Sequence, residues 1–257
     1  MPAEIRLVPC LADNYAVLLH DPATEATAVV DAPDGDAIIA AADAAGWPIN
    51  QVLVTHHHAD HVQGIPALKD RYGATVVGPR KEAALIPGID AVVEDGDPVA
   101  VGGLVGRVLE VPGHTAGHVA YLFEGERLLF SGDTLFSLGC GRAFECEPAV
   151  LWRSLLRLRA LPEALSVYCG HEYTLSNARF ALSVDPDNAD LKAFAARVEA
   201  ERAAGRPTVP SRLAEEIAAN PFLRADDAAL AARLGLAGAE PAAVFTELRA
   251  RKNDFRG

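Results

Sequence analysis

The stretch THHHADH, residues 55–61, concentrates side chains that bind metal ions. It holds four of the chain's eight histidines within six positions, directly after the apolar run QVLV. Imidazole and carboxylate groups together suit zinc, iron or manganese. Alternate residues of a tight loop point the same way, so we expect His56 and His58 to converge on one ion. Asp60 and His61 fall on the next turn, where they can face a second ion nearby.

Three further residues of the same types follow other apolar runs. EVPGH, LFSGD and VYCGH place His114, Asp133 and His171 directly after a glycine and behind a predicted strand. A glycine at that point lets the backbone turn sharply and present the next side chain. Because α/β proteins build their sites at the carboxyl ends of strands, we expect these residues to join the cluster at 55–61. The sequence therefore predicts a metal site assembled from several loops.

The remaining histidines have simpler interpretations. His20 stands alone in an apolar run, and we expect a hydrogen bond within the core to satisfy its ring. His57 lies between two expected ligands and should point away from them, into packing or a supporting contact. His118 is expected to support the ligands through a hydrogen bond rather than to coordinate an ion.

Short runs rich in valine, leucine and aromatic residues predict the strands that would carry these loops. They occupy residues 16–20, 26–32, 51–55, 74–78, 105–111, 118–125 and 127–132. Helices are predicted at 36–46, 66–73 and 147–161. After His171 only helices are expected, at 187–205, 211–220, 226–235 and 241–253, with Ser211 as the N-cap of a capping box. The fold class is therefore α/β, with a catalytic domain over residues 1–172 and a helical, substrate-binding domain over 173–257.

Composition limits the possible partners. The net charge of −12 argues against non-specific nucleic-acid binding and against adhesion to anionic membranes. No apolar run reaches the ~18 residues that span a bilayer, and MPAEIRLVPC lacks the basic-then-apolar pattern of a secretory signal. We therefore expect a cytoplasmic protein, and we expect a monomer. The four cysteines are scattered and are expected to be reduced thiols: Cys10, Cys140, Cys146 and Cys169.

Taken together, THHHADH, PGHTAGH, SGDTLF and CGHEYT resemble the motifs of the metallo-β-lactamase superfamily. LVPCLADNYAVLL, SLGCGRAFE and TVPSRLAEEIAANPFLR resemble more closely the hydroxyacylglutathione hydrolase, or glyoxalase II, family within it. The resemblance extends over nearly the whole chain. It implies an αββα sandwich with a binuclear metal site at its edge, and a helical domain that covers the substrate.

The same resemblance implies a ligand set for two divalent ions, zinc first, with iron or manganese as alternatives. His56, His58 and His114 would hold one ion, and Asp60, His61 and His171 the other. Asp133 would bridge both ions together with a water or hydroxide, which would be the nucleophile. Asp60 and Asp133 are thus the two carboxylates expected to take part in catalysis.

Substrate contacts are also implied by the resemblance, at Arg142, Phe144, Tyr173, Arg249 and Lys252. Phe144 stands where the family commonly has a tyrosine, so this chain lacks one hydroxyl group that could hydrogen-bond to the substrate. Arg249 and Lys252 lie three apart, on one face of the last predicted helix. By themselves, basic residues there would only complement the helix dipole. In the family, an arginine and a lysine at this spacing grip a glutathione carboxylate.

Thioester hydrolysis fits this constellation. A bound metal lowers the pKa of water to about 7, and a thiol can leave as thiolate without a strong general acid. The products implied are a 2-hydroxy acid, D-lactate, and glutathione, as in methylglyoxal detoxification. No G-x-S-x-G nucleophile motif is present. The alternatives are a lactonase on the same scaffold, a redox di-iron protein and a non-catalytic metal-binding module. Persulfide dioxygenase and β-lactamase activities are less consistent with the helical tail and with Asp133.

Overall fold

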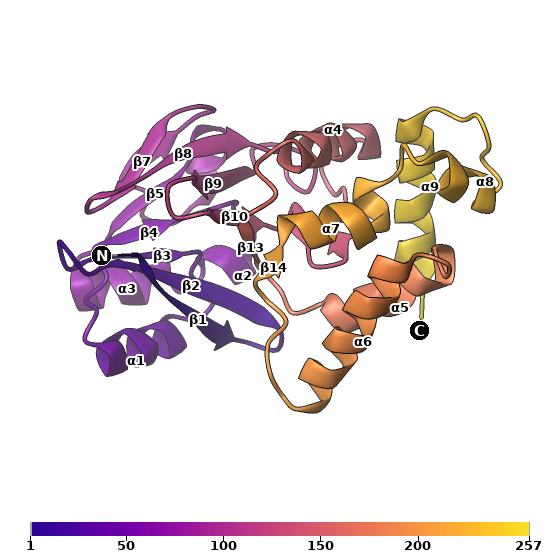
Figure 1. Ribbon diagram of the computed structural model, residues 1–257. Coiled ribbons are helices and arrows are strands. Elements are labelled where there is room, and N and C mark those ends of the chain that lie inside the picture. Colours follow the sequence, from indigo (N-terminus) through magenta and orange to yellow (C-terminus); the bar gives the residue numbers. More distant parts are fainter. Residues whose placement is uncertain (1, 257) are drawn as a thin grey trace. The chain divides into compact units, whose positions relative to one another are not determined.

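The computed structural model describes residues 2–256, which divide into two compact units. The first unit runs to Glu110 and resumes over Thr115–Gly132. The second comprises Val111–His114 and the chain from Asp133 onward. The predicted class, mixed α/β sheets followed by a helical region, is confirmed (Figure 1).

A six-stranded sheet forms the first layer of the first unit. Its strands lie in the order β1 (Glu4–Cys10), β2 (Asn14–Asp21), β3 (Ala26–Val30), β4 (Gln51–Leu53), β5 (Thr75–Pro79) and β6 (Ala91–Val93). The first two pairings are antiparallel, and the pairings from β3 to β6 are parallel. Parallel neighbours need long crossovers, which contain α1 (Gly35–Ala45), α2 (Ala59–Val62), α3 (Ile65–Tyr72) and the 3-10 helix η1 (Arg80–Leu85).

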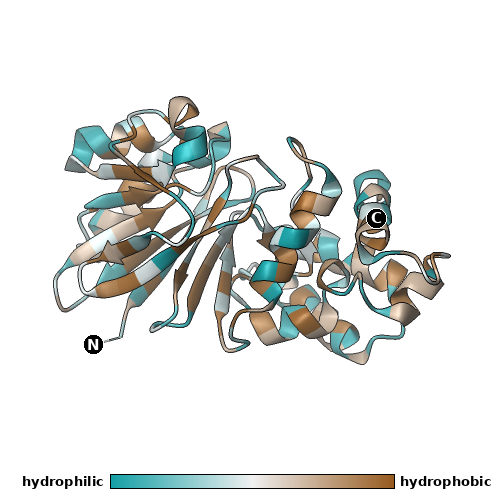
Figure 2. Ribbon diagram, turned by 90° about the horizontal axis from the view of Figure 1, so that it is seen from above, coloured by the Kyte–Doolittle hydropathy of each residue, from teal (hydrophilic) through white to brown (hydrophobic). Residues whose placement is uncertain are grey.

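An antiparallel meander forms the second layer of this unit. It contains β7 (Pro98–Val101), β8 (Leu104–Glu110), β9 (Val119–Phe123) and β10 (Leu128–Gly132), each paired with the next. Every residue of β2, β9 and β10 is buried, whereas β7 alternates between exposed and buried. Strands covered on both faces are rich in apolar residues, and Figure 2 shows brown, hydrophobic stretches along strands of the sheets.

Helices dominate the second unit. After the short hairpin of β11 (Leu135–Phe136) and β12 (Gly139–Cys140) come α4 (Pro148–Arg159), β13 (Ser166–Cys169), α5 (Thr174–Val184), α6 (Ala189–Ala203), β14 (Ser211–Arg212), α7 (Leu213–Ala219), the 3-10 helix η2 (Pro221–Leu223), α8 (Ala228–Arg233) and α9 (Pro241–Asp254). Helix α5 packs against α6, and α4 packs against α9. None of the helices within 2–256 is long and apolar enough to cross a membrane.

Two sequence predictions fail in the second unit. Ser211 does not cap a helix: it lies in β14, paired with Val167 of β13, and α7 begins after Arg212 with no side-chain cap. Pairing with β13 keeps the backbone extended at Ser211, so a strand does follow His171. Helix α5 was not predicted, because it starts directly after Tyr173 without a capping side chain.

The four cysteines are free thiols, as predicted. Cys10, Cys140 and Cys169 are buried, and Cys146 is partly exposed. Burial raises the pKa of the Cys10 and Cys140 thiols to about 11 and that of Cys169 to about 12. Burial also raises the pKa of the Cys146 thiol.

Helices α1 and α3 approach each other through glycine. Asp34 caps α1 by accepting a hydrogen bond from the Ala37 N–H at 3.1 Å. At the start of α3, Gly64 faces the first residue of α1, Gly35. A β-carbon at Gly64 would lie 2.6 Å from the Gly35 nitrogen and 2.9 Å from the Ala32 carbonyl oxygen. Both are backbone atoms, so this contact admits no side chain.

We therefore expect Gly64→Ala to lower the free energy of unfolding by about 1–3 kcal/mol, the usual cost of overpacking. Chemical denaturation followed by circular dichroism measures it. Gly125→Ala is the matched control, since a β-carbon there meets no atom within 4 Å. Equal stabilities of the two variants would contradict the close approach.

Candidate functional site

The loop after β4 brings the first group of predicted ligands together within the first unit. The Nε2 atom of His56 lies 3.1 Å from Nδ1 of His58, and the His56 and His61 ring centroids are 4.1 Å apart. His56 and His61 are fully buried. Asp60 lies in the first turn of α2, with its carboxylate 3.7 Å from Nε2 of His61 and its side chain 42% exposed. The Asn14 amide donates to that carboxylate at 3.1 Å.

One buried carboxylate, Asp31, orients these rings. It accepts hydrogen bonds from the Thr55 N–H at 2.7 Å, the Thr55 hydroxyl at 2.8 Å and Nδ1 of His61 at 2.8 Å. The Thr55 oxygen lies 3.0 Å from Nδ1 of His56 and can accept its proton. Both rings are thereby held with Nε2 as the nitrogen that can coordinate a metal, the usual arrangement at metal-binding histidines.

Asp31 itself lies within ligand reach of His56 and His61. Its two oxygens already accept three hydrogen bonds, so it is better suited to support the ligands than to bind the ion. Sequence analysis missed this residue. The available signal was an acidic residue directly after the apolar run TAVV.

His57 makes a supporting contact with Glu82, as predicted, but its ring does not point away from both neighbours, since it lies edge-on to the His58 ring with centroids 5.1 Å apart. Glu82 accepts from the His57 backbone N–H at 2.7 Å and lies 2.9 Å from its Nδ1. The other Glu82 oxygen accepts from the Thr115 hydroxyl at 2.5 Å and the Gly117 N–H at 2.8 Å. The buried Glu82 carboxylate therefore links the ligand loop to the 115–117 turn through hydrogen bonds. This role was not predicted from the sequence.

The other two histidines in question, His118 and His20, have different surroundings. His118 stacks on the His56 ring, with centroids 4.7 Å apart, so it packs against a predicted ligand. His20 bonds to the Thr27 hydroxyl at 2.9 Å and stacks on Trp47, which confirms the simpler interpretation of this residue.

In the second unit, Asp133 lies between two imidazoles. Its Oδ2 is 3.5 Å from Nε2 of His114 and 3.3 Å from Nε2 of His171, and all three residues are buried. Nδ1 of His114 donates to the Arg142 carbonyl at 2.9 Å, which again leaves Nε2 as the coordinating nitrogen. The preceding Gly113 has φ +146°, and a β-carbon there would meet Leu151 at 2.5 Å. The prediction that a glycine is required before His114 is therefore confirmed.

Two aromatic side chains flank these ligands. Tyr173 is 37% exposed and stacks on His171, with centroids 4.6 Å apart and ring planes 7° apart. Phe144 is 61% exposed, and its centroid lies 5.3 Å from that of His114. Both rings thus offer exposed apolar surface beside predicted metal ligands.

The two predicted basic contacts of α9 have different environments. Arg249 is buried and donates to the Cys140 carbonyl at 2.8 Å, with its guanidinium over the Phe222 ring. Lys252 is partly exposed and donates to the Ser176 hydroxyl at 2.9 Å. The pKa of the Lys252 ammonium is lowered to about 8. Burial is the largest cause, and the positive charges of Arg249 and the exposed Arg142 add to it.

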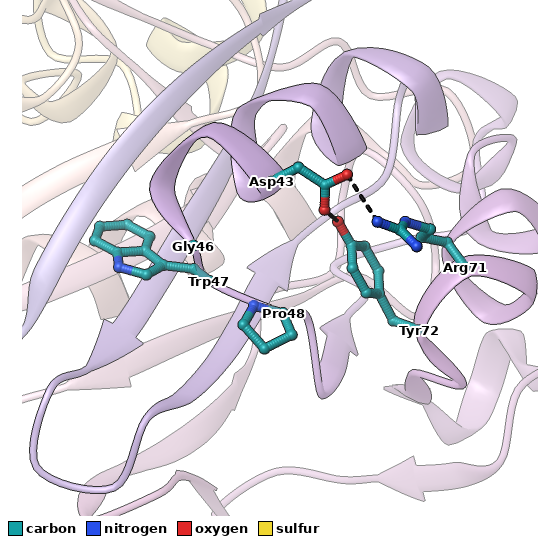
Figure 3. A pocket seen from close by; sticks show the side chains of 6 residues that line it. All are labelled: Asp43, Gly46, Trp47, Pro48, Arg71 and Tyr72. Atoms are coloured by element: carbon teal, nitrogen blue, oxygen red, sulfur yellow. Dashed lines mark hydrogen bonds and ion pairs between the residues drawn. The ribbon is translucent and has the colours of Figure 1, made fainter.

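A concavity of about 510 Å³ elsewhere in the first unit lacks this chemistry. Figure 3 shows its lining: Asp43, Gly46, Trp47, Pro48, Arg71 and Tyr72. The Asp43 carboxylate accepts from Tyr72 at 2.6 Å and from Arg71 at 3.0 Å. Its one carboxylate is thus already engaged, and no histidine or cysteine lines it.

Comparison with known proteins identifies two matching families. The description "Metallo-beta-lactamase superfamily" matches residues 13–171, and "Hydroxyacylglutathione hydrolase C-terminus" matches residues 172–255. A hydroxyacylglutathione hydrolase of Rhodopseudomonas palustris (strain BisA53) is 57% identical over 98% of this chain and 99% of its own length. One of Maricaulis maris (strain MCS10) is 54% identical over 98% of each.

Solved structures agree on the fold. The crystal structure of ETHE1 from Myxococcus xanthus has a TM-score of 0.70 and 27% identity, covering 97% of this chain and 91% of that one. The BLEG-1 B3 metallo-β-lactamase has a TM-score of 0.67 at 20% identity, covering 86% and 99%. The fold is thus that of the metallo-β-lactamases with an added helical region. This fold, with its histidine and aspartate clusters, implies binding of divalent metal ions.

The Asp31 contacts generate a prediction about metal affinity. In Asp31→Asn, an NH₂ group would face a hydrogen-bond donor, Thr55 or His61, and at least one ring would lose its orientation. We expect metal binding to weaken by about 10–100-fold, measured by competition with a chromogenic chelator. The exposed Asp70→Asn is the control. Unchanged affinity in a folded Asp31→Asn protein would show that Asp31 does not orient the ligands.

Proposed function

The chain belongs to the hydroxyacylglutathione hydrolase family of the metallo-β-lactamase superfamily, and from that premise we infer that it hydrolyses S-(2-hydroxyacyl)glutathione thioesters. The observation that carries this inference is identity of 54–57% to hydroxyacylglutathione hydrolases over nearly the full length of both chains. The products are a 2-hydroxy acid and glutathione. S-D-lactoylglutathione is the proposed substrate and D-lactate the proposed acid, which is the reaction of methylglyoxal detoxification.

We propose that the chain holds two metal ions. His56, His58 and His114 would hold one, Asp60, His61 and His171 the other, and Asp133 would serve both. In support, the hydrogen bonds within each unit leave Nε2 of His56, His61 and His114 as the coordinating nitrogen. Zinc is the proposed metal, and the same donors accept iron or manganese. A structure 27% identical to this chain, TTHA1623, was solved in a di-iron-bound form.

When bound, the metals supply Lewis acidity that activates water and polarises the thioester carbonyl. The chain's own residues do the rest. Asp31 and Thr55 fix the imidazoles before substrate arrives, so no reorganisation is needed during the reaction. Asp60 and Asp133 are the proposed catalytic carboxylates, and one of them would accept the proton that the attacking water loses. No acid is required for the leaving group, because a thiol departs as thiolate.

The proposed substrate contacts come from the second unit. The exposed faces of Phe144 and Tyr173 offer apolar surface beside His114 and His171. Arg142 and Lys252 offer positive charge for the carboxylates of glutathione. Arg249 is proposed to add to that charge, although one of its nitrogens already binds the Cys140 carbonyl. Lys252 is therefore the stronger candidate for direct contact.

We propose that the enzyme acts as a cytoplasmic monomer on a small molecule, without a nucleic-acid or membrane partner. Its net charge of −12 supports the last two points, since nucleic acids and most membrane surfaces are anionic.

The assay that tests the function is hydrolysis of S-D-lactoylglutathione by the purified protein, with metal content measured on the same sample. We expect turnover with two metal ions per chain. We also expect poor cleavage of the coenzyme A thioester of the same acid, because the proposed contacts bind the glutathione part of the substrate. Comparable efficiency on both carriers, or full activity with one ion, would refute the corresponding part of the proposal.

Lys252→Ala should raise KM by roughly ten-fold with little change in kcat, because its carboxylate partner has the same charge in the ground and transition states. The protonated ammonium is the binding form, so wild-type KM should rise as pH passes about 8. The variant should lose that rise. Lys192→Ala, at an exposed position of α6, is the control. A pH-independent wild-type KM would argue against Lys252 as the contact.

A further inference from the structure

The β11–β12 hairpin connects two parts of the proposed site. Asp133 stands two residues before the hairpin, and Arg142 stands two residues after it. At its open end, the Gly141 N–H donates to the Thr134 carbonyl at 3.2 Å. The Arg142 carbonyl in turn orients His114. Any shift of the hairpin therefore moves the Asp133 carboxylate and the ring of His114 together.

Side chains from the helical segments hold the turn of this hairpin, in addition to the pairing of its own two strands. Leu138 adopts φ +55°, a conformation that is unfavourable for a leucine, and its N–H donates to Glu216 at 2.8 Å. Asn177 donates to the Ser137 carbonyl at 3.1 Å. Asn220 donates to the Gly139 carbonyl at 3.0 Å and also to Glu216 at 3.0 Å.

These three side chains come from separate elements and are buried at the hairpin. Asn177 lies in α5, Glu216 in α7, and Asn220 at the junction of α7 and η2. Glu216 and Asn220 are fully buried, and Asn177 is 4% exposed. Burial raises the pKa of the Glu216 carboxyl to about 7. Buried polar groups are costly unless paired, and here the pairing is with the backbone of one turn.

The fit around the turn is close. A β-carbon at Gly139 would lie 2.4 Å from the Asn177 amide nitrogen. Arg249 reaches the same hairpin through the Cys140 carbonyl. Side chains of the helical segments therefore hydrogen-bond to the backbone of each hairpin residue from Ser137 to Cys140.

We propose that Glu216, Asn177 and Asn220 are positioning residues for the hydrolysis. Their side chains hydrogen-bond to the hairpin backbone rather than to the proposed ligands or substrate contacts. They fix the hairpin, and through it the placement of Asp133 and His114. The proposal rests on the proposed function, but its effect on metal binding can be measured without substrate.

The test compares Glu216→Ala with Glu216→Gln. The amide oxygen of glutamine can still accept from Leu138 and Asn220, so Glu216→Gln should keep kcat and metal affinity within about two-fold. Glu216→Ala leaves the Leu138 N–H unpaired and should lower kcat by about 10–100-fold, the effect of a small misplacement at a catalytic site. It should also weaken metal binding by about ten-fold. Asn177→Ala should act in the same direction and replaces Glu216→Ala if that variant does not fold.

Leu230→Ala is the control for general destabilisation, because Leu230 is a buried residue of α8 outside these contacts. At matched loss of melting temperature it should keep wild-type kcat and metal affinity. An equal loss of both in Leu230→Ala, or wild-type values of both in Glu216→Ala and Asn177→Ala, would overturn the proposal. If the wild-type protein hydrolyses no glutathione thioester, the proposed function fails, while the metal affinities still decide the positioning role.

Discussion

The first unit's part of the site depends on one buried carboxylate, that of Asp31. A histidine binds a metal through one ring nitrogen, so the other must be occupied and the ring must not rotate. Asp31 meets this need twice, directly at His61 and through the Thr55 hydroxyl at His56. The parallel sheet makes this possible, because the Asp31 N–H bonds to Leu53 at the end of β4 and brings the two strand ends together. The Gly35–Gly64 contact then anchors the helices that follow these strands.

The second unit meets the same need with backbone in place of a carboxylate. The Arg142 carbonyl holds His114, and the hairpin before it is held by amide and carboxyl groups of the helical segments. The helices of this unit therefore have a role beyond offering a surface to the substrate. They fix a stretch of chain that has too few residues to fold into a stable structure alone.

Much of this could be predicted from the sequence, for a physical reason. His56, His58, His61, His114 and His171 each follow an apolar run closely, so local pattern alone places them at strand ends. The supporting role of the other residues could not be assigned in this way, even though Asp31 also follows an apolar run. Asp31 and Glu82 meet their partners across 24 to 35 residues, and Glu216 meets Leu138 across 78. Such contacts exist only in the tertiary structure. The Ser211 error has the same origin, since pairing with β13 overrode a local capping signal.

The burial of the cysteines has a consequence for an enzyme that releases a thiol. Exchange between a protein thiol and a glutathione disulfide requires the thiolate. With pKa values of about 11 to 12, Cys10, Cys140 and Cys169 hold almost no thiolate at neutral pH, and their burial also keeps a tripeptide away from sulfur. Cys140 lies directly beside the Arg249 guanidinium and is still protected by the same packing. The chain can thus work amid its own product, and amid the oxidised form of that product, without becoming a mixed disulfide at these positions.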